Sequence, residues 1–180
     1  MGIWATPVRT AGLFLASSLT IGALSDLAWG AGQQGGQNAS NAPSIITGHD
    51  VSAIADELYY YDAEPDITTD NDGYPMIRVN DSQTPFQIFF HKCNHDTKQC
   101  DVIEFSAHWD LKNGIQSAVI DKWNQTKLWG VAYRDKQNDP NLSLTVELGD
   151  GVTTDNFDDI VDDWDNAMND FITTIGWKKK

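Results

Sequence analysis

The chain has 180 residues, 41% of them hydrophobic, and includes seven tryptophans, which suffices for one globular domain plus additional segments. Its net charge is −14 at pH 7, and its pI is about 4.3. This charge repels phosphate backbones, and no basic stripe offsets it. We therefore exclude DNA and RNA as direct ligands.

The first 30 residues have the layout of a secretory signal peptide. Arg9 precedes an uncharged, largely apolar run over residues 11–24, which ends before Asp26 and is short for a membrane span. Small residues place the expected cleavage after Gly30, and an uncleaved anchor is the rival interpretation. Cleavage removes one charge of each sign, so the net charge stays at −14. We therefore expect an exported protein, periplasmic or secreted, with no membrane association after cleavage.

A flexible linker is expected over residues 31–44, because their glycine, glutamine and asparagine cannot bury apolar surface. The folded domain is expected over residues 45–176. It begins with a short amphipathic helix over residues 50–60, for which Thr47 or Asp50 would be the N-cap.

The apolar period then changes to two. Residues 64–69 and 76–79 predict two strands, joined by an Asp-Gly turn within residues 70–73. This turn superficially matches an EF-hand loop. Calcium binding is not expected, however, because Thr68 and Val79 fall at its first and twelfth ligand positions.

A hairpin follows, with one strand over residues 85–91 and another over residues 101–109. Cys93 and Cys100 lie at its mouth and are the only cysteines of the chain. A disulfide is the economical interpretation for an exported protein. The alternative is a zinc site made by four nearby side chains, namely His91, Cys93, His95 and Cys100, whose spacing matches no common zinc motif.

A second helix is predicted over residues 114–125, with Asn124 expected to cap or end it, and two strands are predicted over residues 128–134 and 142–148. On the helix, the expected core residues are Ile115, Val119 and Trp123. On the strands, the expected core residues are Trp129, Val131 and Tyr133, followed by Leu142, Leu144, Val146 and Leu148.

The longest predicted element is a helix over residues 153–176. Its apolar stripe consists of Phe157, Ile160, Val161, Trp164, Met168, Phe171, Ile172 and Ile175. Aspartates and asparagines occupy the other face, which is interpreted as solvated, with calcium or a basic partner as alternatives. Residues 177–180 form a basic tail. The order α-β-β-β-β-α-β-β-α predicts an α+β fold with helices packed on an antiparallel sheet.

Several pieces of this order together resemble a known family. They are Asp72-Gly73-x-Pro75-x-Ile77, the strand ending at Cys93, Cys100, Trp123-Asn124, Ala132-Tyr133-x-Asp135, and Gly151-Val152-Thr153 before the helix with Trp164. Residues 45–175 thereby resemble the YbjN family of bacterial proteins, labelled sensory transduction regulators. The resemblance implies a fold similar to type III secretion chaperones, which commonly form dimers and hold extended peptides. It implies no catalytic residue and no cofactor.

The sequence shows no recognised nucleophile motif and no convergent acid and base. We therefore expect a non-enzymatic protein-binding or regulatory module without cofactor or metal. Its partner would be an unidentified protein or peptide, or a second copy in a homodimer. The alternative is a small-ligand carrier or enzyme that uses a polar cluster near Glu104, His108 and Asp110, with His108 pointing outward. Trp109 and Trp177, at the ends of their elements, are the expected exposed binding residues.

Overall fold

The computed structural model describes residues 43–59, 64–80 and 84–178. The predicted signal peptide, residues 31–42 of the predicted linker and the last two lysines lie outside the described residues. The order of the described elements is β1-α1-β2-β3-β4-β5-α2-β6-β7-β8-α3. The predicted α+β class and the order of its elements are confirmed. Two short strands, β1 (Ile45–Ile46) and β8 (Val152–Thr153), are additional and pair with each other.

A six-stranded antiparallel sheet is the centre of the fold, with the strand order β2-β3-β4-β5-β7-β6. Its strands are β2 (Pro65–Thr69), β3 (Pro75–Val79), β4 (Phe86–Cys93), β5 (Cys100–His108), β6 (Val131–Arg134) and β7 (Pro140–Glu147). The register places Ile77, Ile88 and Phe105 side by side on one face. The outer strands are β2 and β6.

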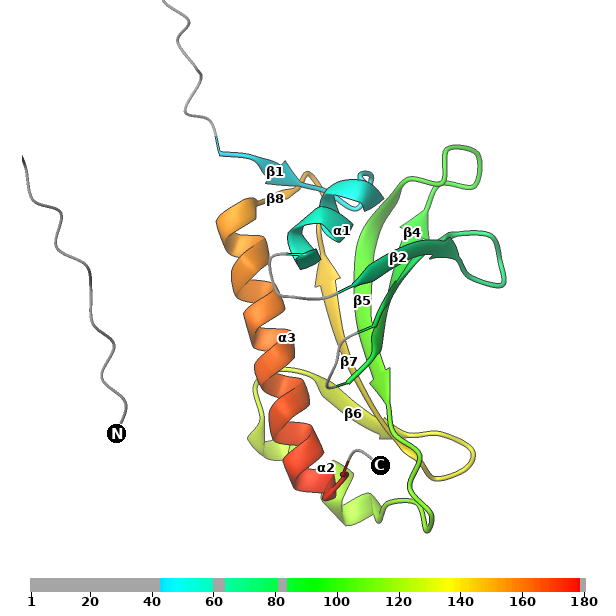
Figure 1. Cartoon of the computed structure of the whole chain (residues 1–180), viewed down its shortest axis with the longest axis vertical. Coiled ribbons are helices and arrows are strands. Elements are labelled where there is room, and N and C mark those ends of the chain that lie inside the picture. Colours follow the sequence, from blue (N-terminus) through cyan, green and yellow to red (C-terminus); the bar gives the residue numbers. More distant parts are fainter. Residues whose placement is uncertain (1–42, 60–63, 81–83, 179–180) are drawn as a thin grey trace, which may run out of the picture. The chain divides into compact units, whose positions relative to one another are not determined.

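Helix α3 (Thr154–Ile175) runs along this face of the sheet (Figure 1). The Thr153 hydroxyl accepts a hydrogen bond from the Asn156 N–H at 3.2 Å, and Gly176 ends the helix in the left-handed conformation. The predicted apolar stripe is confirmed, because its buried members are Phe157, Val161, Trp164, Met168 and Phe171. The remaining predicted members are partly buried against the core, namely Ile160, Ile172 and Ile175.

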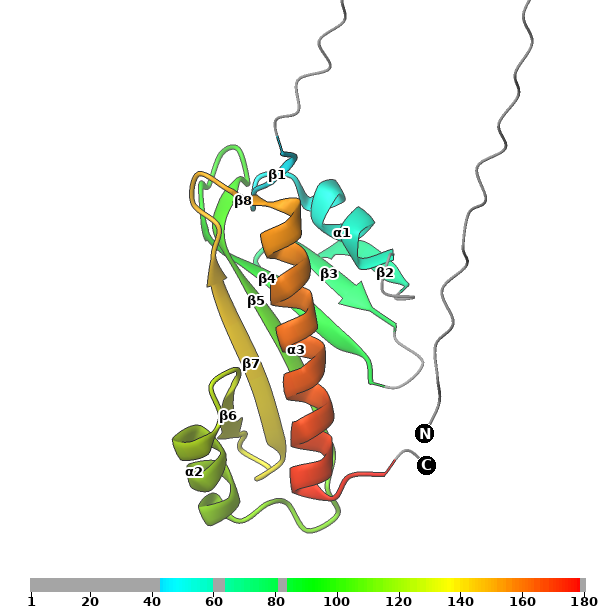
Figure 2. The same cartoon turned by 90° about the vertical axis from the view of Figure 1, so that its left-hand side faces the viewer.

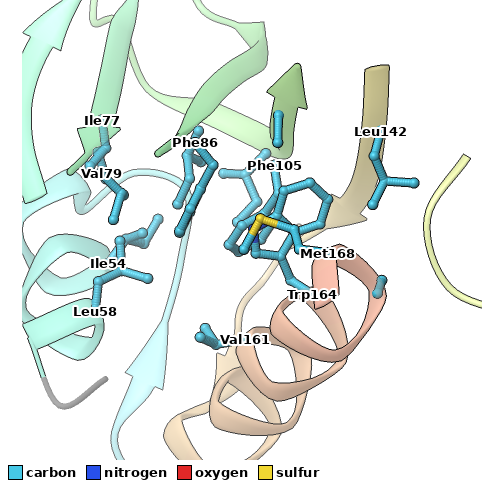
Figure 3. Close-up of a cluster of buried hydrophobic side chains, with 14 of the residues drawn as sticks. Ile54, Leu58, Ile77, Val79, Phe86, Phe105, Leu142, Val161, Trp164 and Met168 are labelled. Carbon is cyan, nitrogen blue, oxygen red and sulfur yellow. The ribbon is translucent and has the colours of Figure 1, made fainter. Parts of the chain in front are cut away.

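Aromatic side chains fill the space between α3 and the sheet (Figure 3). The Trp164 ring lies 5.6 Å from that of Phe105 and 5.8 Å from that of Phe86. Further along the helix, the Phe171 ring lies 4.8 Å from that of Trp123. Much of the core is therefore formed by contacts between the last helix and strands far away in sequence.

The two shorter helices lie at opposite ends of the sheet (Figure 2). Helix α1 (Val51–Tyr59) begins after Asp50, whose carboxylate accepts a hydrogen bond from the Ala53 N–H at 3.0 Å. Helix α2 (Ser117–Thr126) starts later than predicted and leaves Ile115 outside it. Ile115 and Val119, which were expected in the core, are only half-buried, whereas the buried residues of α2 are Ile120 and Trp123. None of the helices in the described ranges is long and apolar enough to cross a bilayer.

Candidate binding surface

Four large apolar side chains are exposed within and just before β6. Leu128, Trp129, Val131 and Tyr133 are exposed by 84, 45, 63 and 43%, and we call these four residues the β6 patch. Elsewhere in the described part of the chain, the large exposed hydrophobic residues are scattered over β1, α1 and β2, namely Ile45, Tyr59 and Ile67. Because proteins that act alone rarely gather exposed apolar side chains, the β6 patch is the strongest candidate for a contact surface.

The predicted inward orientation of Trp129, Val131 and Tyr133 is wrong. The strand begins at Val131, and its buried side chain is Ala132, which lies opposite the buried Leu142 of β7. Since side chains alternate along a strand, Val131 and Tyr133 point to the opposite face. Trp123 of α2 belongs to the same buried core cluster as Ala132.

Three hydrogen bonds join α2 to β6 and to Gly130, the residue just before it. Trp123 Nε1 donates to the Gly130 carbonyl at 2.9 Å. Asn124 Oδ1 accepts from the Ala132 N–H at 2.9 Å, and Asn124 Nδ2 donates to the Ala132 carbonyl at 3.0 Å. Asn124 therefore does not end the helix, which continues to Thr126, but occupies the place of a neighbouring strand. The outer edge of β6 is closed at Ala132.

Replacing Asn124 by alanine is expected to lower the free energy of unfolding by about 1–2 kcal/mol, because two hydrogen bonds worth about 1 kcal/mol each are lost. The Ala132 amide should also exchange faster with solvent. Asn124→Asp is the matched control, since it keeps the acceptor for the Ala132 N–H and should leave that amide protected. Urea denaturation and amide hydrogen exchange measure both effects. Unchanged Ala132 exchange in Asn124→Ala would show that another group closes this edge.

The expectation that Trp109 is exposed is wrong. Its side chain is only 2% exposed, and its ring lies 5.3 Å from that of Phe171. The inward alternation of β5 continues past the last strand residue, so that Ala107 and Trp109 both face the core. Trp109 therefore contributes to packing and presents little surface to a protein partner.

Trp177, which the sequence assigns to a basic tail, belongs to the packed domain. It is half-buried against the core, and its N–H donates to the Ile172 carbonyl at 3.2 Å. Trp177 and Trp109 meet His108 and Asp110 at a pocket of about 250 Å³. The structure thus joins both expected binding tryptophans to part of the expected polar cluster.

Glu104 does not belong to this pocket. It precedes His108 by four strand residues, which corresponds to about 13 Å along β5. Glu104 Oε2 lies 2.8 Å from His91 Nε2, so its partner is in the adjacent strand β4. His108 is exposed, in agreement with its expected outward orientation. The predicted three-residue cluster is therefore divided: Glu104 lies within β5, whereas His108 is its last residue and Asp110 follows it.

Cys93 and Cys100 form a disulfide directly across the β4–β5 hairpin. The histidines of the alternative zinc site have other neighbours: His91 pairs with Glu104, and His95 pairs with Asp96. Across the ranges that the structure describes, no group of three or more His, Cys, Asp or Glu side chains is arranged to hold a metal ion.

Carboxylates of α1 and α3 form an acidic surface where Glu57 lies close enough to Asp158 to be repelled by it. Burial, followed by repulsion from Asp158 and Asp56, raises the pKa of Glu57 above its ordinary value. Burial and the neighbouring aspartates of α3 likewise raise the pKa of Asp158. A raised carboxyl pKa means that the folded state favours the protonated form. The unfavourable contribution of these two groups to the free energy of unfolding therefore decreases as pH falls through their pKa values.

The described residues define an α+β domain in which helices cover one face of an antiparallel sheet. An exposed apolar patch lies within and just before one outer strand. The model of the YbjN family, described as "putative bacterial sensory transduction regulator", matches residues 50–177. The chain belongs to the YbjN family. No curated protein and no solved structure matches it, so the likeness to type III secretion chaperones stays a prediction.

Proposed function

We propose that the chain is an exported, non-enzymatic module of the bacterial envelope that regulates a process by binding another protein. The observation that carries this proposal is the β6 patch, with Leu128 exposed by 84% and three further apolar side chains beside it. Membership of a family described as regulators supports a regulatory role, and the predicted signal peptide supports export. The protein would be periplasmic or secreted.

The β6 patch has the composition and support of a protein contact. Tryptophan and tyrosine carry much of the binding energy in protein interfaces, because they bury large areas with few rotatable bonds. The hydrogen bonds from Trp123 and Asn124 hold the backbone beneath the patch in place. Little conformational entropy would therefore be lost when a partner with an apolar surface covers it.

Site-specific photocrosslinking in a bacterial host tests this proposal. A photoreactive residue at position 128 should give a reproducible, stoichiometric crosslink to one protein. The same residue at Asn166, an exposed position on α3 away from both outer strands of the sheet, should not. Mass spectrometry of the purified product identifies the attached chain and reads the mature N-terminus. Equal crosslinking from both positions, or none from position 128, would contradict binding at the patch, and an intact Met1 would contradict export with cleavage.

A second copy of the chain is the other occupant that we propose for the β6 patch. In that case the crosslinks from position 128 would join identical chains. Light scattering would then give twice the monomer mass, and Trp129→Ser should return the protein to the monomer, because the apolar side chain at the contact is lost.

The alternative function, a small-ligand carrier or enzyme of the envelope, now rests on the pocket with His108 and Asp110 rather than on a cluster that includes Glu104. Complementation of a deletion strain discriminates between the two functions. Loss of complementation by His108→Ala, with folding intact and Leu128→Ser still active, would favour the alternative. The reverse pattern favours protein binding through the β6 patch.

A further inference from the structure

The two outer edges of the sheet are not equivalent. Asn124 closes the edge of β6 by bonding both backbone groups of Ala132. The other edge belongs to β2, at the far side of the sheet (Figure 2). An edge strand whose outward backbone groups are free can pair with a strand of another chain, so the outward groups of β2 are the ones to identify.

Two hydrogen bonds at the ends of β2 show which of its backbone groups face β3. The Asp70 N–H donates to the Tyr74 carbonyl at 2.9 Å, and the Asn80 N–H donates to the Glu64 carbonyl at 3.1 Å. Along a strand of an antiparallel pair, residues whose backbone groups bond to the partner strand alternate with residues whose backbone groups point away from it. The even-numbered residues of β2 therefore bond to β3. The residues with outward backbone groups are therefore Pro65, Ile67 and Thr69.

These outward groups form a short docking edge. Ile67 and Thr69 each offer an N–H and a carbonyl, whereas Pro65 offers only a carbonyl. Among the hydrogen bonds within residues 43–59, 64–80 and 84–178, none uses the N–H of Ile67 or Thr69. The Ile67 side chain is 48% exposed and lies opposite the fully buried Ile77, so an apolar anchor adjoins the edge.

The acidic side chains around β2 favour a basic partner. Residues 64–80 carry four acidic side chains and one basic side chain, Arg78. Arg78 lies opposite Asp66 in the register, yet no ion pair joins the two within the described part of the chain. An added strand with Lys or Arg beside Asp66 and an apolar residue beside Ile67 would complement this edge on both faces.

Pairing of β2 with a second copy of itself is disfavoured. Antiparallel registers centred on Asp66, Ile67 or Thr68 are the ones that overlap most of the strand. In that order, these registers place Asp66 opposite Asp66, Glu64 opposite Asp70, and Asp66 opposite Asp70. Like charges directly opposite each other destabilise a sheet. The occupant is therefore a different chain.

We propose that β2 accepts an extended, basic segment of a partner protein as a seventh strand of the sheet. This site is separate from the β6 patch and does not depend on it, because the two lie at opposite edges. A protein could bind at the patch without using β2, and the reverse also holds. Failure of the crosslinking experiment at position 128 therefore leaves this proposal standing.

The test uses the full exported chain, labelled with ¹⁵N, and the peptide acetyl-Lys-Val-Lys-Val-Lys-Val-Lys-amide. The control peptide has the same side chains but is N-methylated at every central residue, so it keeps the charge and cannot donate along a strand. With the first peptide at ten times its Kd, exchange of the Ile67 and Thr69 amides should slow about tenfold. The control peptide should leave both amides unprotected.

Protein variants separate strand pairing from simple charge attraction. Ile67→Pro removes an outward N–H and the apolar anchor at an edge position that tolerates proline, and should weaken peptide binding at least tenfold. Thr69→Pro, which keeps Ile67, serves if the first variant does not fold. Leu128→Ala is the matched control at the other edge and should bind as the wild type does. Equal binding of both peptides, or no protection of Ile67 and Thr69, would overturn the proposal.

Discussion

Replacing Trp164 by alanine is expected to lower the free energy of unfolding by about 3–5 kcal/mol, as for other buried aromatic residues. Trp164 is 1% exposed, and its ring packs against Phe105 and Phe86, where α3 meets the sheet. Alanine would leave a cavity there that the surrounding strands cannot close. Since domains are stable by only about 5–15 kcal/mol, this is a large share of the total. Urea denaturation followed by circular dichroism measures the change.

Trp129→Ala is the matched control for this experiment. Its side chain is 45% exposed in the β6 patch, so its loss should cost less than about 1 kcal/mol. Trp164→Phe should cost less than Trp164→Ala, because the phenyl ring keeps most of the packing. It also removes an indole N–H that has no hydrogen-bond partner in the described part of the structure. Similar losses for Trp164→Ala and Trp129→Ala would contradict the core position of Trp164.

Removing the disulfide is expected to cost about 2–3 kcal/mol, because the unfolded chain is no longer restricted by the short loop that the bond closes. The double variant Cys93→Ala, Cys100→Ala avoids leaving a free thiol. Its urea midpoint should match that of the wild type in reductant, and reductant should not change the variant further. A wild-type midpoint that is insensitive to reductant would contradict a stabilising role of the bond.

Thiol titration provides an independent check of the same bond. The native chain should contain no titratable thiol before reduction and two after it, since Cys93 and Cys100 are the only cysteines. Two free thiols together with stoichiometric zinc would instead support the metal site that the nearby histidines offer.

Long periodic segments made most of the fold predictable. The stripe of α3 repeats at the helical period over 22 residues, and Gly176 marks its C-terminal end in the sequence. The strands of the β4–β5 hairpin alternate clearly and end at the two cysteines. The short pair β1 and β8 was not predictable, because two residues carry no periodic signal. That pair forms where Gly151, at φ 107, lets the chain pass close to Ile45.

The candidate contact surfaces were less predictable. Alternation over residues 128–134 correctly indicates a strand but leaves open which set of side chains faces the core. The apolar residues favoured the wrong set, since Ala132 gives a weak signal beside Val131 and Tyr133. The role of Asn124 also left no local signal, because its partner Ala132 is eight residues away. The presence of Trp123-Asn124 among the family motifs was the one available hint.

The sequence by itself determined the α+β class, the helix that covers the sheet and the family. These properties depend on periodicity and capping residues, which are local. Only the tertiary structure decided that Trp109 is buried, that Glu104 is separated from His108, and that Asn124 closes the edge of β6. Such properties depend on which segments lie side by side, and that arrangement follows from packing the whole chain at once.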